Sequence, residues 1–91
     1  MLNESLNYDT VDSGSFTYTL KSGNTLSQQI TFNKSFTKPP IVNVSTNASN
    51  FGGLSCEARN ITTSGFTFYV PAVTGYNLNL TCSWNAVGKG N

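Results

Sequence analysis

Apolar and polar residues alternate along most of the chain, and this period of two is typical of β-strands. In the closing stretch NLNLTCSW (77–84), every apolar residue is followed by Asn, Thr or Ser until the single tryptophan. A helical period of 3.6 residues is not visible in any segment. The pattern therefore predicts an all-β fold.

The alternation divides the chain into short strands separated by turn residues. Ser22–Asn24 and Thr62–Gly65 have the composition of turns, and Asn47–Gly53 and 71–75 that of loops. Proline donates no ladder hydrogen bond, so the stretch 38–40 (KPP) marks a crossing between strands. The predicted strands are 15–21, 26–33, 41–46, 54–61, 66–70 and 76–87. Six short strands with turns between them predict an antiparallel β-sandwich.

The same alternation predicts which residues face the core. Trp84 shares its side of the last strand with Leu78, Leu80 and Cys82, so we expect it to be packed in the core and not to face a ligand. Cys56 also falls on an inward position. We expect Cys56 and Cys82 to be buried free thiols that behave as small hydrophobic residues.

A chain of 91 residues has room for one small domain. Alternation is weak in residues 1–13, which we interpret as a stem or linker, and residues 14–91 form the predicted domain. No segment approaches the roughly 18 consecutive apolar residues of a membrane span, so membrane insertion is not expected. The first residues lack the basic and apolar regions of a signal peptide.

Charged residues make up only 10% of the chain, and the net charge is +1. Nucleic-acid binding normally requires a basic face, so we do not expect a nucleic-acid partner. The polar residues are mainly Asn, Ser, Thr and Gln. Such a surface suits hydrogen bonding to a neutral partner such as carbohydrate, or packing against copies of the chain itself.

The chain contains few residues that could carry out catalysis. The chain has no histidine, which excludes imidazole acid–base catalysis and imidazole metal ligation. Its acidic residues are Glu4, Asp9, Asp12 and Glu57, and no two share a strand face as a glycosidase pair requires. We expect these acids to be solvated at the surface. The sequence therefore predicts no enzyme, no metal site and no cofactor.

The remaining possibility is saccharide binding, because aromatic side chains can stack on sugar rings while amides and charged groups form hydrogen bonds with the sugar hydroxyls. Tyr69 and Tyr76 have the right chemistry, but they could equally cover the rim of the sandwich. Glu57 and Arg59 could equally form a surface ion pair or a subunit contact. The candidate ligand-binding residues are Tyr76, Asn50, Asn47, Arg59, Glu57 and Lys21.

Three stretches together resemble the H-type lectin family. They are ITFNKSFTKPPIVNVS (30–45), ITTSGFTFYV (61–70) and LTCSWNAVG (80–88). In that family an I-x-F strand leads through an aromatic residue to proline and an apolar strand, followed by a hairpin ending in Gly-Phe and a last strand with W-x-A. The resemblance covers about residues 15–88.

The resemblance implies a six-stranded antiparallel sandwich that assembles as a homotrimer. The family includes invertebrate agglutinins specific for N-acetylgalactosamine, and similar domains end the tail and baseplate fibres of bacteriophages, where W-x-A-x-G is common near the terminus. The agglutinins' sugar-binding residues do not carry over: their aspartate falls on Lys21, their arginine near Gly53 and their Trp-His pair near Val73 and Thr74. Agglutinin-type specificity is therefore not implied. The loops 21–25, 47–53 and 71–76 would converge at the subunit boundary.

These observations favour a non-enzymatic, receptor-binding tip domain of a phage tail, baseplate or related fibre, which attaches a virion to host cell-surface saccharide. A secreted, extracellular H-type lectin is the first alternative. A structural trimerisation domain without a ligand is the second. The expected partners are further copies of the chain and a cell-surface or cell-wall saccharide.

Overall fold

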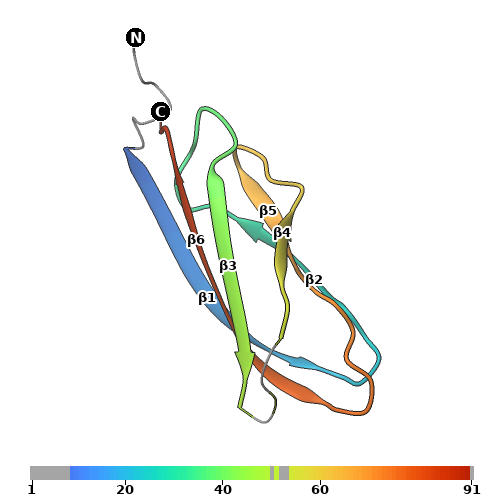
Figure 1. Ribbon diagram of the computed structural model, residues 1–91. Helices are drawn as coiled ribbons and strands as arrows, with labels where there is room; N and C mark the ends of the chain where they lie inside the picture. Colours follow the sequence, from blue (N-terminus) through green and yellow to red (C-terminus); the bar gives the residue numbers. More distant parts are fainter. Residues whose placement is uncertain (1–8, 50, 52–53, 91) are drawn as a thin grey trace.

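The computed structural model describes residues 9–49, 51 and 54–90, which form two antiparallel β-sheets packed face to face (Figure 1). The strands are β1 (Thr10–Leu20), β2 (Leu26–Thr31), β3 (Ile41–Ala48), β4 (Glu57–Arg59), β5 (Gly65–Val70) and β6 (Leu78–Gly88). One sheet has the order β1-β6-β3 and the other β2-β5-β4. The predicted six-stranded antiparallel sandwich is confirmed. Over the described residues, no helix has the length and apolarity needed to cross a membrane.

The first strand begins earlier than the alternation predicted. Residues 10–13 belong to β1 and pair with β6, where Thr10 lies opposite Gly88. The predicted stem at 1–13 therefore overlaps a strand, and residues 1–8 lie outside the described residues. The hydrophobic pattern is weak here because the inward positions carry Asp12 and Gly14 instead of apolar side chains.

Other strand boundaries also differ from the prediction, most of all in β4, which starts at Glu57 and not at residue 54. β4 ends at Arg59 because Asn60 has a φ of 53°, a left-handed conformation that asparagine tolerates better than most residues. β6 starts at Leu78, after a loop in which Gly75 has a φ of 96°. β3 extends to Ala48, so Asn47 lies in a strand and not in the predicted loop.

The core lies between the sheets and is rich in aromatic residues. Trp84 is 7% exposed, and its ring centroid lies 5.7 Å from that of Phe32 and 5.6 Å from that of Phe66. Gly14 faces Trp84 across the β1–β6 pair, where a Cβ atom would lie 2.8 Å from the indole. The prediction that Trp84 is a core residue is confirmed.

The two cysteines are free, as expected, but they differ in burial. Cys82 is buried in the core, whereas Cys56 is only half-buried. Burial raises the pKa of the thiol in both residues; in Cys82 a hydrogen-bonding contact with the Thr46 hydroxyl opposes this effect. A raised pKa keeps both groups in the poorly nucleophilic thiol form near neutral pH.

Asp12 is not the solvated surface acid that the sequence predicted. It is 6% exposed, and its carboxylate accepts hydrogen bonds from the backbone N–H groups of Ser13 (3.0 Å), Asn33 (2.6 Å) and Lys34 (3.2 Å). The Asn33 side-chain amide donates a further bond at 3.3 Å. Burial opposes ionisation, but these donors outweigh it and lower the pKa of Asp12 below its usual value. Asp12 therefore links β1 to the segment that follows β2 in the other sheet.

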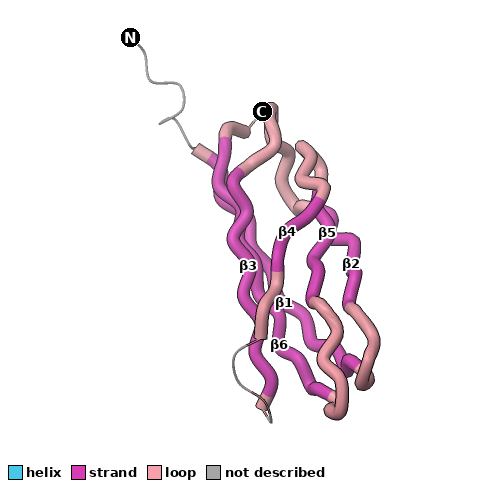
Figure 2. Tube along the Cα trace, turned by 45° about the vertical axis from the view of Figure 1, so that its right-hand side comes forward, coloured by secondary structure: helices cyan, strands magenta, loops and turns pink. Residues whose placement is uncertain are grey.

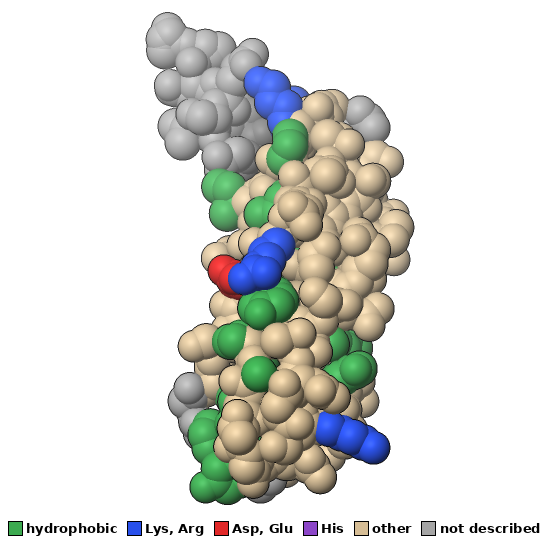
Figure 3. Space-filling view, turned by 90° about the vertical axis from the view of Figure 1, so that its right-hand side faces the viewer, with side chains coloured by type: hydrophobic (Ala, Val, Ile, Leu, Met, Phe, Trp, Pro, Cys, Tyr) green, Lys and Arg blue, Asp and Glu red, His purple; other side chains and the backbone are tan. Residues whose placement is uncertain are grey.

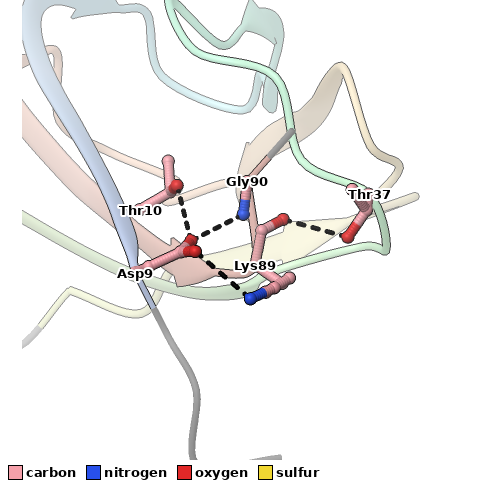
Figure 4. A network of polar contacts seen from close by, with 5 residues as sticks. All are labelled: Asp9, Thr10, Thr37, Lys89 and Gly90. Atoms are coloured by element: carbon pink, nitrogen blue, oxygen red, sulfur yellow. Dashed lines mark hydrogen bonds and ion pairs between the residues drawn. The ribbon is translucent and has the colours of Figure 1, made fainter. Parts of the chain in front are cut away.

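Asp9 joins the start of β1 to the end of β6 (Figure 4). Its carboxylate accepts hydrogen bonds from the Gly90 N–H at 2.8 Å and the Thr10 hydroxyl at 2.9 Å, and the Lys89 ammonium lies at 3.3 Å. The Gly90 hydrogen bond, helped by Thr10 and Lys89, lowers the pKa of Asp9 to about 2. The Lys89 carbonyl accepts from the Thr37 N–H at 2.8 Å and hydroxyl at 3.2 Å. This end of the sandwich is thus closed by polar contacts.

Candidate functional site at the loop end of the sandwich

The opposite end of the sandwich is formed by connections between strands. The turn 21–25 joins β1 to β2, and the loop 71–77 joins β5 to β6 (Figures 1 and 2). Phe51, in the connection after β3, forms an isolated bridge with Ala48 at the same end. We call these three segments the loop end.

The turn 21–25 has a fixed shape that depends on glycine. The Asn24 N–H donates to the Lys21 carbonyl at 3.0 Å, which closes a β-turn. Gly23 has a φ of 82°, a conformation that residues with a Cβ rarely adopt. The Gly23 N–H then donates to the Val73 carbonyl at 3.0 Å, and this bond attaches the turn to the loop 71–77.

Ser22 strengthens this attachment through both its backbone and its side chain. Its N–H donates to the Asn77 side-chain oxygen at 2.9 Å, and its hydroxyl accepts from the Gly75 N–H at 2.8 Å. Three hydrogen bonds therefore connect two segments that are far apart in sequence. Because both segments are anchored at each end by strands, the loop end presents a preorganised surface.

An aromatic pair lies on this surface. Tyr76 is 52% exposed, and its ring centroid lies 5.1 Å from that of Phe51, at an interplanar angle of 50°. The partly buried Phe51 packs against the hydrophobic core, so it supports Tyr76 from below. A tyrosine ring held in this way offers an apolar face for stacking and a hydroxyl for hydrogen bonding.

The structure places the predicted ligand-binding residues in three regions. Tyr76 and Lys21 lie at the loop end, and both are exposed. Asn47 lies on β3, with its exposed side chain on the outer face of the β1-β6-β3 sheet. Glu57 and Arg59 lie on β4. Asn50 lies outside the described residues.

Glu57 and Arg59 form a separate cluster with Tyr69 on the β2-β5-β4 sheet. The Arg59 Nε donates to Glu57 Oε1 at 2.7 Å, and the guanidinium carbon lies 3.6 Å from the centroid of the Tyr69 ring. The two side chains thus form the surface ion pair that the sequence left open as one alternative. Figure 3, which views the right-hand side of Figure 1, shows a mostly uncharged face on which an acidic group lies directly beside a basic one.

Phe51 is the candidate residue that sequence reasoning did not select. The feature of the sequence that could have pointed to Phe51 is its aromatic side chain within NASNFGG, a segment rich in Asn and Gly. Its pairing with Tyr76 depends on a contact between segments some twenty-five positions apart, which periodicity does not predict. Within the described part of the chain, no three His, Cys, Asp or Glu side chains come together as a metal site requires.

Comparison with solved structures identifies proteins of the same fold. The tailspike protein gp49 from Pseudomonas phage LKA1 matches 90% of this chain with a TM-score of 0.76 and 18% identity. The tailspike gp61 of Pseudomonas phage phi297 matches 87% of the chain, with a TM-score of 0.68 and 18% identity. The N-truncated tail fibre of an R1-type pyocin matches 86% of the chain, with a TM-score of 0.68 and 13% identity.

The chain is much shorter than the two tailspikes, covering 15% of each, and it covers 69% of the truncated pyocin fibre. A search of curated proteins found no match. A family model described as the H-type lectin domain matches residues 27–87, which run from β2 almost to the end of β6. This match includes β2 to β6, and the six-stranded antiparallel sandwich is the fold that the resemblance implies. The chain therefore belongs to the H-type lectin domain family.

Proposed function

We propose that this chain is a non-enzymatic carbohydrate-binding domain at the tip of a phage tail fibre, tailspike or related particle, and that it attaches the particle to a saccharide of the host cell surface. The supported aromatic pair at the loop end is the observation that carries this proposal. The family match and the likeness to tailspike and pyocin-fibre structures support it.

The state of the acidic residues supports a binding function without catalysis. Asp12 is buried and hydrogen-bonded, Asp9 is bound to the chain end, and Glu57 is paired with Arg59. A glycosidase needs two carboxylates that face one substrate bond. The described carboxylates are instead each engaged in a structural contact, and the chain contains no histidine.

We also propose that the domain acts as a homotrimer, as the family resemblance implies. A single loop end holds a sugar through one aromatic pair and a few hydrogen bonds, so its affinity is weak. Several equivalent loop ends on one particle raise the overall affinity through effective concentration, by about a hundredfold or more.

Tyr76→Ala is expected to lower binding to immobilised bacterial cell-surface polysaccharides by roughly tenfold or more, because the exposed ring is the main stacking surface. Its melting temperature should stay close to that of the parent chain, since Tyr76 is half exposed. Surface plasmon resonance and thermal melting measure the two effects.

The matched control is Tyr76→Phe, which keeps the stacking ring and should retain most binding. Undiminished binding by Tyr76→Ala would place the ligand site elsewhere. Failure of the parent chain to bind any polysaccharide on a broad bacterial and animal glycan array would favour the structural trimerisation domain instead.

Binding is also expected to depend little on salt. Lys21 is the one charged residue in the described loop-end segments, which suits a neutral saccharide. Binding by Lys21→Ala should therefore change with salt as little as binding by Lys38→Ala in a titration between about 0.05 and 0.5 M salt. Lys38 is an exposed lysine in the β2–β3 connection at the opposite end of the sandwich, so Lys38→Ala serves as the control. A steep loss of binding over this range would show that the ligand is anionic. A loss with Lys21→Ala that does not change with salt would instead show that the Lys21 ammonium donates hydrogen bonds to a neutral ligand.

A further inference from the structure

The outer face of the β1-β6-β3 sheet carries no charged residue at any outward position of its three strands. The strand register places these side chains in cross-strand rows. From the loop end upward the rows read Thr19–Asn79, Thr17–Thr81–Asn47, Ser15–Ser83–Ser45, Ser13–Asn85–Asn43 and Val11–Val87–Ile41. We call this surface the uncharged face.

The last of these rows is apolar and open to solvent. Val11 is 54% exposed and Ile41 is 53% exposed, with Val87 between them on the central strand. These two are among the few large exposed hydrophobic residues of the described chain. Neighbouring apolar side chains on a polar surface are typical of a protein contact.

The middle of the uncharged face is hollow. Small side chains from all three strands, with Asn43 and Asn85 at one border, surround a depression of about 450 Å³. The Asn43 side-chain amide donates to the Asn85 side-chain oxygen at 3.2 Å, so this cross-strand pair has a fixed arrangement. Serine side chains are too short to fill the space, and side chains of a facing surface could enter it.

The outer face of the other sheet has a different character. The Glu57–Arg59 ion pair and the Tyr69 ring lie on it, and these groups already contact one another. Around a three-fold axis, the side chains nearest the axis lie close to their own copies, so a charge there would repel its counterparts. The absence of charge therefore favours the β1-β6-β3 sheet for contact between copies.

We propose that the uncharged face is the surface through which copies of this chain pack against one another. The proposal rests on the assembly suggested above and adds the surface that forms it. The copies are parallel, because a parallel arrangement brings the apolar rows of Val11, Val87 and Ile41 together while the rest of the uncharged faces also overlap. An antiparallel arrangement would place each apolar row against the threonines and asparagines near the loop end.

This packing has two consequences for ligand binding. All loop ends of the assembly point in the same direction, which suits simultaneous attachment to one cell surface. Asn47, a candidate ligand residue from the sequence, lies in the row Thr17–Thr81–Asn47 and becomes a subunit contact. The saccharide site then consists of loop-end residues such as Tyr76.

The test compares Ser45→Glu on the uncharged face with Ser27→Glu on the outer face of the other sheet. Both serines are exposed and lie on edge strands, β3 and β2. The parent and Ser27→Glu should have three times the 9.8 kDa chain mass by sedimentation equilibrium. Ser45→Glu should weaken association by roughly a hundredfold or more and sediment as a folded monomer.

Equal masses for the two variants, or dissociation by Ser27→Glu alone, would overturn the proposal, as would a monomeric parent. If Ser45→Glu does not fold, hydroxyl-radical labelling of the parent decides the question: Val11 and Ile41 should be protected at high concentration and labelled on dilution, while Tyr76 is labelled throughout. Protection of Tyr69 in place of Val11 and Ile41 would contradict it. These measurements use no saccharide, so their outcome is independent of whether Tyr76→Ala loses binding.

Discussion

Replacing Trp84 with alanine is expected to lower the free energy of unfolding by about 3–5 kcal/mol, a large part of the stability of a small domain. The indole contacts Phe32 and Phe66 and covers Gly14, so truncation leaves a cavity that these neighbours cannot close. Urea denaturation followed by circular dichroism measures the loss, at one fixed protein concentration because association shifts apparent stability.

Tyr18→Ala is the matched control, since it removes an aromatic ring that is 41% exposed from the neighbouring strand β1. We expect a loss of no more than about 1 kcal/mol, as is usual at exposed positions. If Trp84→Ala unfolds at the same urea concentration as the parent but no longer binds polysaccharide, Trp84 is a ligand residue and its assignment to the core is wrong.

Asp12→Ala is expected to destabilise the fold by about 1–3 kcal/mol, because it leaves several partly buried donors without their acceptor. The N–H groups of Asn33 and Lys34 would lose the carboxylate that connects them to β1. Asp12→Asn keeps one acceptor oxygen and should lose less. Equal stability of the parent and Asp12→Ala in urea would show that water replaces the carboxylate without loss.

The lowered pKa of Asp12 also predicts a pH dependence. The unfolded chain binds the proton more tightly, so the contribution of Asp12 is fully present above the unfolded-state pKa of about 4. It is lost as the pH falls from there through the folded-state pKa. Unfolding free energies measured from pH 6 downward should therefore fall more steeply below about pH 4 in the parent than in Asp12→Asn. Parallel curves would show that Asp12 does not contribute.

The local pattern of the sequence was sufficient to predict the fold class, most of the strands and the core role of Trp84. The alternation in residues 77–84 has one structural solution, because a shift of one residue would expose every apolar side chain and bury the asparagines. The KPP crossing and the turn with Gly23 likewise follow from properties of single residues, namely the missing N–H of proline and the left-handed φ of glycine.

Other features depended on contacts between segments distant in sequence, and only the tertiary structure decided them. Residues 10–14 have no hydrophobic pattern, because their inward positions carry Asp12 and Gly14. Asp12 accepts hydrogen bonds from Asn33 and Lys34, and Gly14 faces the Trp84 ring. The candidate site also depends on contacts between distant segments. Tyr76 is supported by Phe51 from another loop, whereas Glu57 and Arg59 neutralise each other on the outside of the β2-β5-β4 sheet. Strand periodicity determines which side of a sheet a residue faces, but the partner it meets there depends on sheet order and register.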